Sequence, residues 1–167
     1  HGKQPPCTDA LIEAGVGEVV FARSDPAEVS AGGIDVLNTA GIPARLSDAS
    51  PMATRLSDPF IYRVQTGLPW VVAKWAQTID GRIATRTGES QWISGPMSRR
   101  RVHRLRARMD AIMTGLGTVV TDDPMLTARD VRRVRRPCRR IILDRDLDIT
   151  NDRAIVRTAS DTPTSIV

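Results

Sequence analysis

A lysine, two serines and a tryptophan in the middle of the chain have types and spacings that suit chemistry. Lys74 lies in the apolar run 70–76, which predicts a buried strand, and α/β sheets bind ligands where their strands end. Ser90 and Ser94 supply hydroxyls on either side of Trp92, whose flat face can pack on a nicotinamide or a ribose. The plain alternative is a strand, a turn and a core tryptophan.

A glycine turn at 115–117 follows the apolar residues 111–114 and precedes a short helix expected over 118–121. A strand, a glycine turn and a helix start together present backbone N–H groups to a phosphate. Gly-x-Gly alone is a weak match, because the full dinucleotide fingerprint has a third glycine. An ordinary strand-to-helix turn, stopped at Asp123-Pro124, is the alternative.

Cys7 follows Pro5-Pro6 at the expected start of a helix over 8–15. The dipole of a helix favours a thiolate at its start, and the thiolate is the form that binds zinc. Zinc deaminases use a Pro-Cys-x-x-Cys signature with a His and a Glu upstream. One Cys of that signature is present here with no partner ligand before it, so a plain helix-start cysteine is the alternative.

Arginines dominate the charge of the chain, which is +5 with a pI of about 10.2. They concentrate in two segments, 99–108 and 129–140. This balance favours anionic partners, either nucleic acid or phosphorylated small molecules. The second segment contains no aromatic residue for base stacking, so phosphorylated small molecules are favoured. The alternative is a solvated helix face followed by a solvated loop.

The elements that must position these residues follow from periodicity and turn signals. In the first part, helices are expected over 8–15 and 32–40, and strands over 19–22 and 44–46. This alternation predicts a mainly parallel sheet covered by helices. Residues 47–59 are polar and predict a linker or a connecting helix.

In the second part, a polar stretch with a tight turn at Asp80-Gly81 follows the strand over 70–76. Pro96 suits the first turn of a helix that runs to about Arg108. The further expected elements are strands over 111–114, 141–143 and 165–167, and helices over 118–121 and 151–159.

Composition bounds the class of protein. The 167 residues are 41% hydrophobic, which suffices for a packed core, and no apolar run approaches the length of a membrane span. Two distant cysteines do not make a disulfide framework and fit a reducing cytoplasm. The chain begins at His1 without an initiator Met, which predicts an internal fragment or the ordered part of a longer protein.

Four segments, in this order, closely resemble the bifunctional pyrimidine deaminase and uracil reductase family of riboflavin biosynthesis. They are His1–Ala10, Lys74–Ile93, Val102–Arg108 and Gly117–Thr127. The resemblance implies an α/β chain in which residues 1–62 are the C-terminal part of a cytidine-deaminase-like zinc domain. It implies that residues 63–167 are the N-terminal part of a dihydrofolate-reductase-like domain.

The resemblance also implies site residues. Contacts to NADPH are expected at Ala76, Trp92, Thr118 and Asp122. Contacts to a phosphorylated ribosylaminopyrimidine substrate are expected at Ser90, Ser94, Arg106, Leu126 and Arg129. Lys3 matches a deaminase substrate position, and Cys7 matches the last zinc ligand. Ala27 stands where the family has Asn, which weakens deaminase substrate recognition.

The implied chemistry is transfer of hydride from NADPH to the ribose C1, which gives a ribitylamino product. Lys74 is the first candidate to polarise or protonate near that carbon, and Asp122 is the second. The coupled step is zinc-dependent deamination. One alternative is a reductase-only protein with a degenerate deaminase, and another is a basic nucleic-acid-binding module. We expect a cytoplasmic enzyme without membrane or nucleic-acid partners, and a homo-oligomer stays open.

Overall fold

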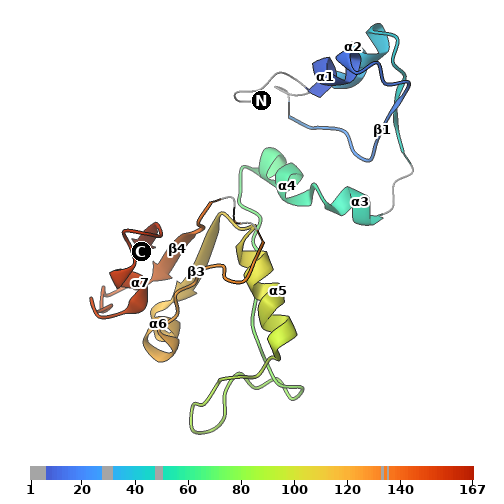
Figure 1. Cartoon of the computed structure of the whole chain (residues 1–167). Coiled ribbons are helices and arrows are strands. Elements are labelled where there is room, and N and C mark those ends of the chain that lie inside the picture. The colour runs from blue at the N-terminus through green and yellow to red at the C-terminus, as the bar shows by residue number, and fades with distance from the viewer. Residues whose placement is uncertain (1–6, 28–31, 48–50, 133, 135) are drawn as a thin grey trace. The chain divides into compact units, whose positions relative to one another are not determined.

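The computed structural model describes residues 7–27, 32–47, 51–132, 134 and 136–167. Residues within the chain gather into two compact units, His1–Lys74 and Trp75–Val167 (Figure 1). Each unit is a mixture of helices and parallel strands.

The first unit contains the parallel pair that alternating helices and strands predicted. Helix α1 (Cys7–Glu13) precedes strand β1 (Val19–Phe21), and helix α2 (Gly33–Thr39) precedes strand β2 (Ala44–Leu46). The strands pair with Val19 opposite Ala44, and α2 makes the crossover that a parallel connection needs. The expected cover is partial, because Val20 and Leu46 are 47% and 58% exposed.

Of the polar segment after β2, residues 51–59 are mainly helical, which agrees with the connecting helix that was one of the two predictions. The chain there forms α3 (Pro51–Arg55) and α4 (Asp58–Thr66), and Ile61 of α4 is buried. Gly67 ends α4 with φ 71°, a left-handed conformation that favours glycine. Beyond it the Trp70 ring packs edge-on against Tyr62, with ring centroids 5.6 Å apart.

The prediction of a buried strand over 70–76 is wrong. These residues form no strand, and Val71, Lys74 and Trp75 are exposed. An apolar run becomes a strand only when a neighbouring strand takes its backbone hydrogen bonds. No strand of the described residues pairs with this segment, so most of its side chains are exposed.

The second unit carries the predicted turn, helix and strands. Gly81 N–H donates to Thr78 O at 2.9 Å, which forms the tight turn expected at Asp80-Gly81. The elements that follow are α5 (Pro96–Arg106), β3 (Ala111–Gly115), α6 (Leu116–Asp122), β4 (Arg139–Leu143), α7 (Ala154–Arg157) and β5 (Thr164–Ile166). The helix expected over 151–159 is therefore shorter than predicted.

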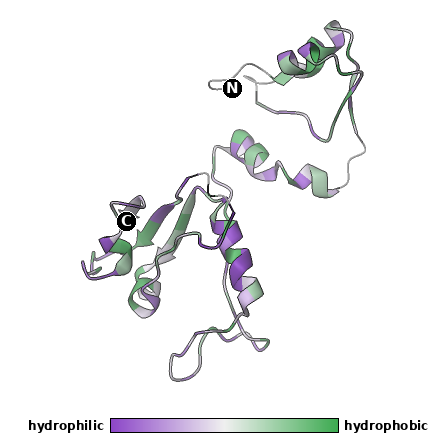
Figure 2. Cartoon of the chain, in the orientation of Figure 1, coloured by the Kyte–Doolittle hydropathy of each residue, from purple (hydrophilic) through white to green (hydrophobic). Residues whose placement is uncertain are grey.

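The three strands of the second unit form a parallel sheet in the order β3-β4-β5, with β3 and β4 side by side in Figure 1. Its core is the cluster Val119, Leu126, Ile142 and Ile155, with Ile112, Ile149 and Val156 packed against it. Helix α5 is mainly hydrophilic (Figure 2), and its apolar residues Val102 and Leu105 are only half-buried.

Arg140 does not lie in a solvated loop, as its place in the second arginine segment suggested. It is part of β4 and its side chain is completely buried. Within the described residues, no helix is long and apolar enough to cross a bilayer.

Candidate functional site

The loop around Trp92 is joined to the end of α6 by one side-chain hydrogen bond. Gln91 Nε2 donates to Asp122 Oδ1 at 3.2 Å. Thr118 and Asp122 stand four residues apart on α6, so they share one helix face, and both are exposed. The structure therefore brings the loop of one predicted cofactor residue, Trp92, to the helix that carries two others.

Trp92 is not a core residue, because it is 70% exposed. The guanidinium of Arg99 lies 4.4 Å from the centre of its ring, a cation–π distance. Arg99 Nη1 also donates to Ser94 O at 2.6 Å. Arg99 thus fixes the backbone at one predicted substrate residue, Ser94, and covers part of the tryptophan ring.

Helix α5 holds the loop of residues 125–129, which carries two further predicted substrate residues. Arg106 Nη1 donates to Thr127 O at 3.4 Å, and the backbone N–H of Arg129 donates to His103 Nδ1 at 3.2 Å. Leu126 is 6% exposed and anchors the loop in the core. Arg106, Leu126 and Arg129 are therefore neighbours in space, although 23 positions separate the first from the last in the sequence.

Positive charge is concentrated where α5 meets this loop. Burial lowers the pKa of Arg106 from its ordinary value, and the charge of Arg129 lowers it further. Burial likewise lowers the pKa of His103, with Arg106 and Arg129 acting in the same direction. Like charges held this close favour a bound anion, because an anion relieves their repulsion.

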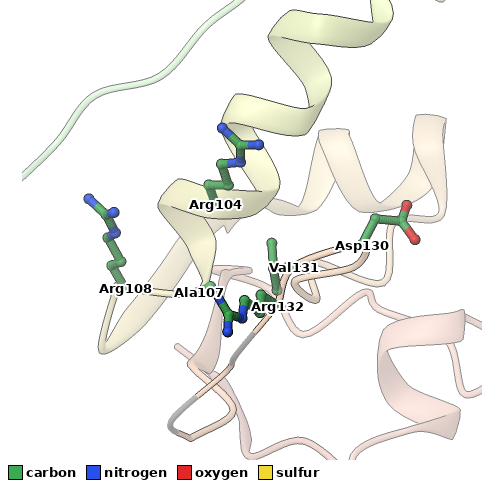
Figure 3. Close-up of a pocket in the computed structure, with 6 residues that line it drawn as sticks. All are labelled: Arg104, Ala107, Arg108, Asp130, Val131 and Arg132. Atoms are coloured by element: carbon green, nitrogen blue, oxygen red, sulfur yellow. The ribbon is translucent and has the colours of Figure 1, made fainter.

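A hollow beside the loop extends this cationic surface (Figure 3). Arg104 on α5, Arg108 just after α5 and Arg132 in the chain after Asp130 line this hollow. Ala107, Asp130 and Val131 complete the lining. The two arginine segments of the sequence therefore meet at one surface.

The sequence did not single out Arg99 and His103 as site residues. With Arg106 they occupy positions i, i+4 and i+7 of α5, which fall on one face of a helix. That spacing is the signal that could have identified them once α5 was predicted. What the face contacts, however, depends on the fold of residues 125–129.

The other predicted residues are placed less closely. Ala76 is half-buried and Ser90 is half-buried, each in irregular backbone. Lys74 is exposed at the end of the first unit. Lys3 lies outside the described residues.

Neither cysteine belongs to a metal centre in the described part of the chain. Cys7 is exposed at the first residue of α1. Cys138 is buried, and burial raises the pKa of its thiol, as for a small core residue. The described residues contain no group of three or more His, Cys, Asp or Glu side chains that could hold a metal ion.

The second unit is a parallel α/β unit whose clustered arginines can bind an anionic group of a ligand. The family model of the RibD C-terminal domain matches residues 69–167. The chain belongs to this family, whose members are enzymes.

Relatives agree with this assignment. The riboflavin biosynthesis protein RibD of Aquifex aeolicus is 38% identical over 99% of this chain and 46% of its own length. That of Mycobacterium tuberculosis (strain H37Rv) is 48% identical over 77% of this chain and 38% of its own length. The chain spans about half the length, or less, of the curated relatives it matches.

Solved structures give the same result. A Thermotoga maritima structure, described as a diaminohydroxyphosphoribosylaminopyrimidine deaminase/5-amino-6-(5-phosphoribosylamino)uracil reductase, matches with TM-score 0.84 and 34% identity. The match covers 99% of this chain and 46% of that one. Acinetobacter baumannii RibD, form 1, also matches with TM-score 0.84 and 34% identity, over 100% of this chain and 48% of that one. These likenesses show that the fold of this chain is that of the corresponding part of the RibD structures.

Proposed function

We propose that this protein is an enzyme of riboflavin biosynthesis. Its reductase half uses NADPH to reduce the ribosyl group of 5-amino-6-(5-phosphoribosylamino)uracil to a ribitylamino group, coupled to zinc-dependent deamination of the pyrimidine precursor. The observation that carries the proposal is the likeness of the whole chain to the Thermotoga maritima deaminase/reductase, at TM-score 0.84 and 34% identity.

The proposal divides the chain between two domains. Residues 1–62 are the C-terminal part of a zinc deaminase domain with a cytidine-deaminase-like fold. Residues 63–167 are the N-terminal part of a dihydrofolate-reductase-like domain. The two-stranded sheet β1-β2 and the three-stranded sheet β3-β4-β5 are separate, and each has its own connecting helices, which supports two domains.

The ribose phosphate of the substrate is bound by Arg106 and Arg129. A guanidinium binds a phosphate through two parallel hydrogen bonds, and the repulsion between these two side chains favours an anion between them. Ser90 and Ser94 offer hydroxyls to the sugar or the pyrimidine. Leu126 contacts the substrate through its backbone, because its side chain is buried in the core. The contacts of α5 with the 125–129 loop support this assignment.

NADPH is held by Ala76, Trp92, Thr118 and Asp122. The described residues fit such a ligand, because they offer an exposed tryptophan ring, a hydroxyl and a carboxylate, and the Gln91–Asp122 bond joins the loop of Trp92 to the helix of Thr118 and Asp122. When bound, the cofactor supplies the hydride. The protein's own contribution is to orient the ribose C1 and to donate the proton that accompanies reduction.

Lys74 is the first candidate for the group that donates this proton. Its ammonium group polarises or protonates the sugar near C1 as the open-chain, imine-like form of the substrate is reduced. Asp122 is the alternative acid, since its carboxylate lies on the helix face that also carries Thr118. If Lys74 is the acid, Lys74→Met should lower kcat. If Asp122 is the acid, Asp122→Asn should lower it.

The residues described here do not by themselves fit a zinc ion, since Cys7 has no partner ligands among them. In the proposed deaminase domain Cys7 is one ligand of the zinc site, and Lys3 contacts the deaminase substrate.

The test is a steady-state assay of the purified protein with NADPH and the phosphorylated ribosylaminouracil. The reaction is monitored through the loss of NADPH absorbance. Substrate-dependent oxidation that needs both reactants is expected. Arg106→Ala should weaken the binding of the phosphorylated substrate and leave the binding of NADPH unchanged. If Arg106→Ala instead weakened DNA or RNA binding while the protein showed no NADPH oxidation, the nucleic-acid-binding alternative would replace this proposal.

A further inference from the structure

Arg140 is a fully buried guanidinium at the centre of the second unit, 0% exposed on strand β4. Its nitrogens donate to four backbone carbonyls and two hydroxyls. The carbonyl acceptors are Met125 O at 3.2 Å, Ile155 O at 2.9 Å, Thr158 O at 3.0 Å and Thr162 O at 3.1 Å. The hydroxyl acceptors are Thr158 Oγ1 at 2.9 Å and Thr164 Oγ1 at 2.9 and 2.7 Å.

This charge is satisfied by neutral oxygens. None of the ion pairs in the described part of the chain involves Arg140. A buried charge without acceptors is costly, so these oxygens must stay where the guanidinium needs them. The guanidinium is planar and holds its five N–H donors in a fixed fork, so one group dictates the relative positions of all its acceptors.

One of those acceptors belongs to the loop that carries the predicted substrate residues. Met125 O receives a hydrogen bond from Arg140 Nη1, and Leu126 follows it with φ 50°, an uncommon conformation for a leucine. The same loop is held by Arg106 at Thr127 and by His103 at Arg129. Arg140 is the contact at the start of the loop, and it reaches the loop from the core.

We propose that Arg140 is a positioning residue for the 125–129 loop, which it joins to α7 and β5 so that Leu126 and Arg129 meet the substrate in a fixed geometry. This inference rests on the proposed function for the identity of the substrate. It goes beyond that function, because Arg140 contacts neither the substrate nor the cofactor residues named above.

The test compares three variants of the purified protein. Arg140→Lys keeps the charge but loses the fork, so the ammonium group cannot reach both Met125 and the α7–β5 carbonyls. Thr164→Val removes the one β5 hydroxyl that accepts from Arg140 Nε and Nη2, and it leaves Met125 in place. Arg139→Lys is the matched control, because Arg139 is the exposed neighbour on β4 and bonds only Ser165 Oγ through its side chain among the described residues.

We expect Arg140→Lys to raise the KM for the phosphorylated substrate about tenfold, as for loss of one charge-assisted hydrogen bond, with kcat and NADPH affinity unchanged. Thr164→Val should lower the Tm without that KM change, and Arg139→Lys should change neither. Hydrogen exchange should show faster exchange of the loop amides in Arg140→Lys and wild-type protection in Thr164→Val.

Equal Tm losses in Arg140→Lys and Thr164→Val, with unchanged KM and loop protection in both, would show that Arg140 is only structural and would overturn the proposal. If Arg140→Lys does not fold, Thr158→Val removes the one side-chain acceptor of Nη1, the nitrogen that also donates to Met125 O, whereas Thr164 is bonded by Nε and Nη2. Thr158→Val should therefore loosen the loop amides. If it does not, the proposal is wrong. Wild-type protein that fails to oxidise NADPH would refute the proposed function instead, and hydrogen exchange would still decide the role of Arg140.

Discussion

Protonation of His103 should weaken substrate binding, because it removes the acceptor that holds Arg129. His103 Nδ1 accepts the backbone N–H of Arg129 at 3.2 Å, so this nitrogen carries no proton in the folded protein. A second proton on the ring places N–H against N–H and adds a third positive charge beside Arg106 and Arg129. The 125–129 loop then loses one of its side-chain contacts.

The direction of the pH effect follows from the surroundings of the ring. Burial lowers the pKa of His103 below 6.5, Arg106 and Arg129 lower it further, and a hydrogen bond with the Thr127 backbone and the charge of Asp130 oppose them. The unfolded chain therefore binds this proton more readily than the folded one. The stability from this contact is present above pH 6.5 and is lost as the pH falls through the lower pKa of the folded protein.

The expected size is that of one neutral hydrogen bond, about 1 kcal/mol, or roughly a fivefold rise in KM for the phosphorylated substrate. The assay is KM against pH from about 8 to about 5 for the wild type and for His103→Asn, whose amide oxygen can accept the same N–H without titrating. The substrate phosphate itself titrates near pH ~6, and this contribution is common to both proteins.

The difference between the two profiles therefore isolates His103. The wild type should lose affinity at low pH more steeply than His103→Asn. Superimposable profiles would refute the role given to His103 and would assign the whole effect to the substrate.

Three further outcomes are expected. Arg106→Ala should raise the KM for the phosphorylated substrate about 100-fold, from two charge-assisted hydrogen bonds of roughly 1.5 kcal/mol each, and an equal loss with a dephosphorylated analogue would contradict the phosphate contact. Trp92→Ala should raise the Kd of NADPH about tenfold, measured by calorimetry, with Trp92→Phe nearer the wild type; an unchanged Kd would remove Trp92 from the cofactor site. Ile155→Ala should destabilise the protein by about 2–5 kcal/mol in urea unfolding, because the side chain is fully buried, while Ile166→Ala, at 39% exposed, should cost clearly less.

Local pattern was sufficient for much of the fold. Alternation of short apolar runs with capped, amphipathic segments predicted β1, β2, β3 and β4 to within a few residues, and Pro96 marked the start of α5. The Asp80-Gly81 turn was predicted for the same reason, since a tight turn depends on the conformations of its own residues. These features depend mainly on residues that are neighbours in the sequence.

The apolar run 70–76 and Arg140 show where local pattern fails. An apolar run favours burial but does not specify a partner strand. None of the described strands pairs with residues 70–76. Arginine is a residue type that is almost always exposed, so its place in a basic segment predicted solvent. The carbonyls that bury Arg140 come from three separate segments and are convergent only after the sheet has formed.

By itself, the sequence determined the class of this protein: a basic, parallel α/β chain of a riboflavin-biosynthesis family, with its candidate residues in recognisable segments. Only the tertiary structure decided that Arg106, Leu126 and Arg129 lie together, that His103 and Arg140 hold their loop, and that Trp92 is open to solvent. The physical reason is that residue type and spacing act over one turn or one strand. A binding site is made of contacts between segments that only packing brings within hydrogen-bond distance.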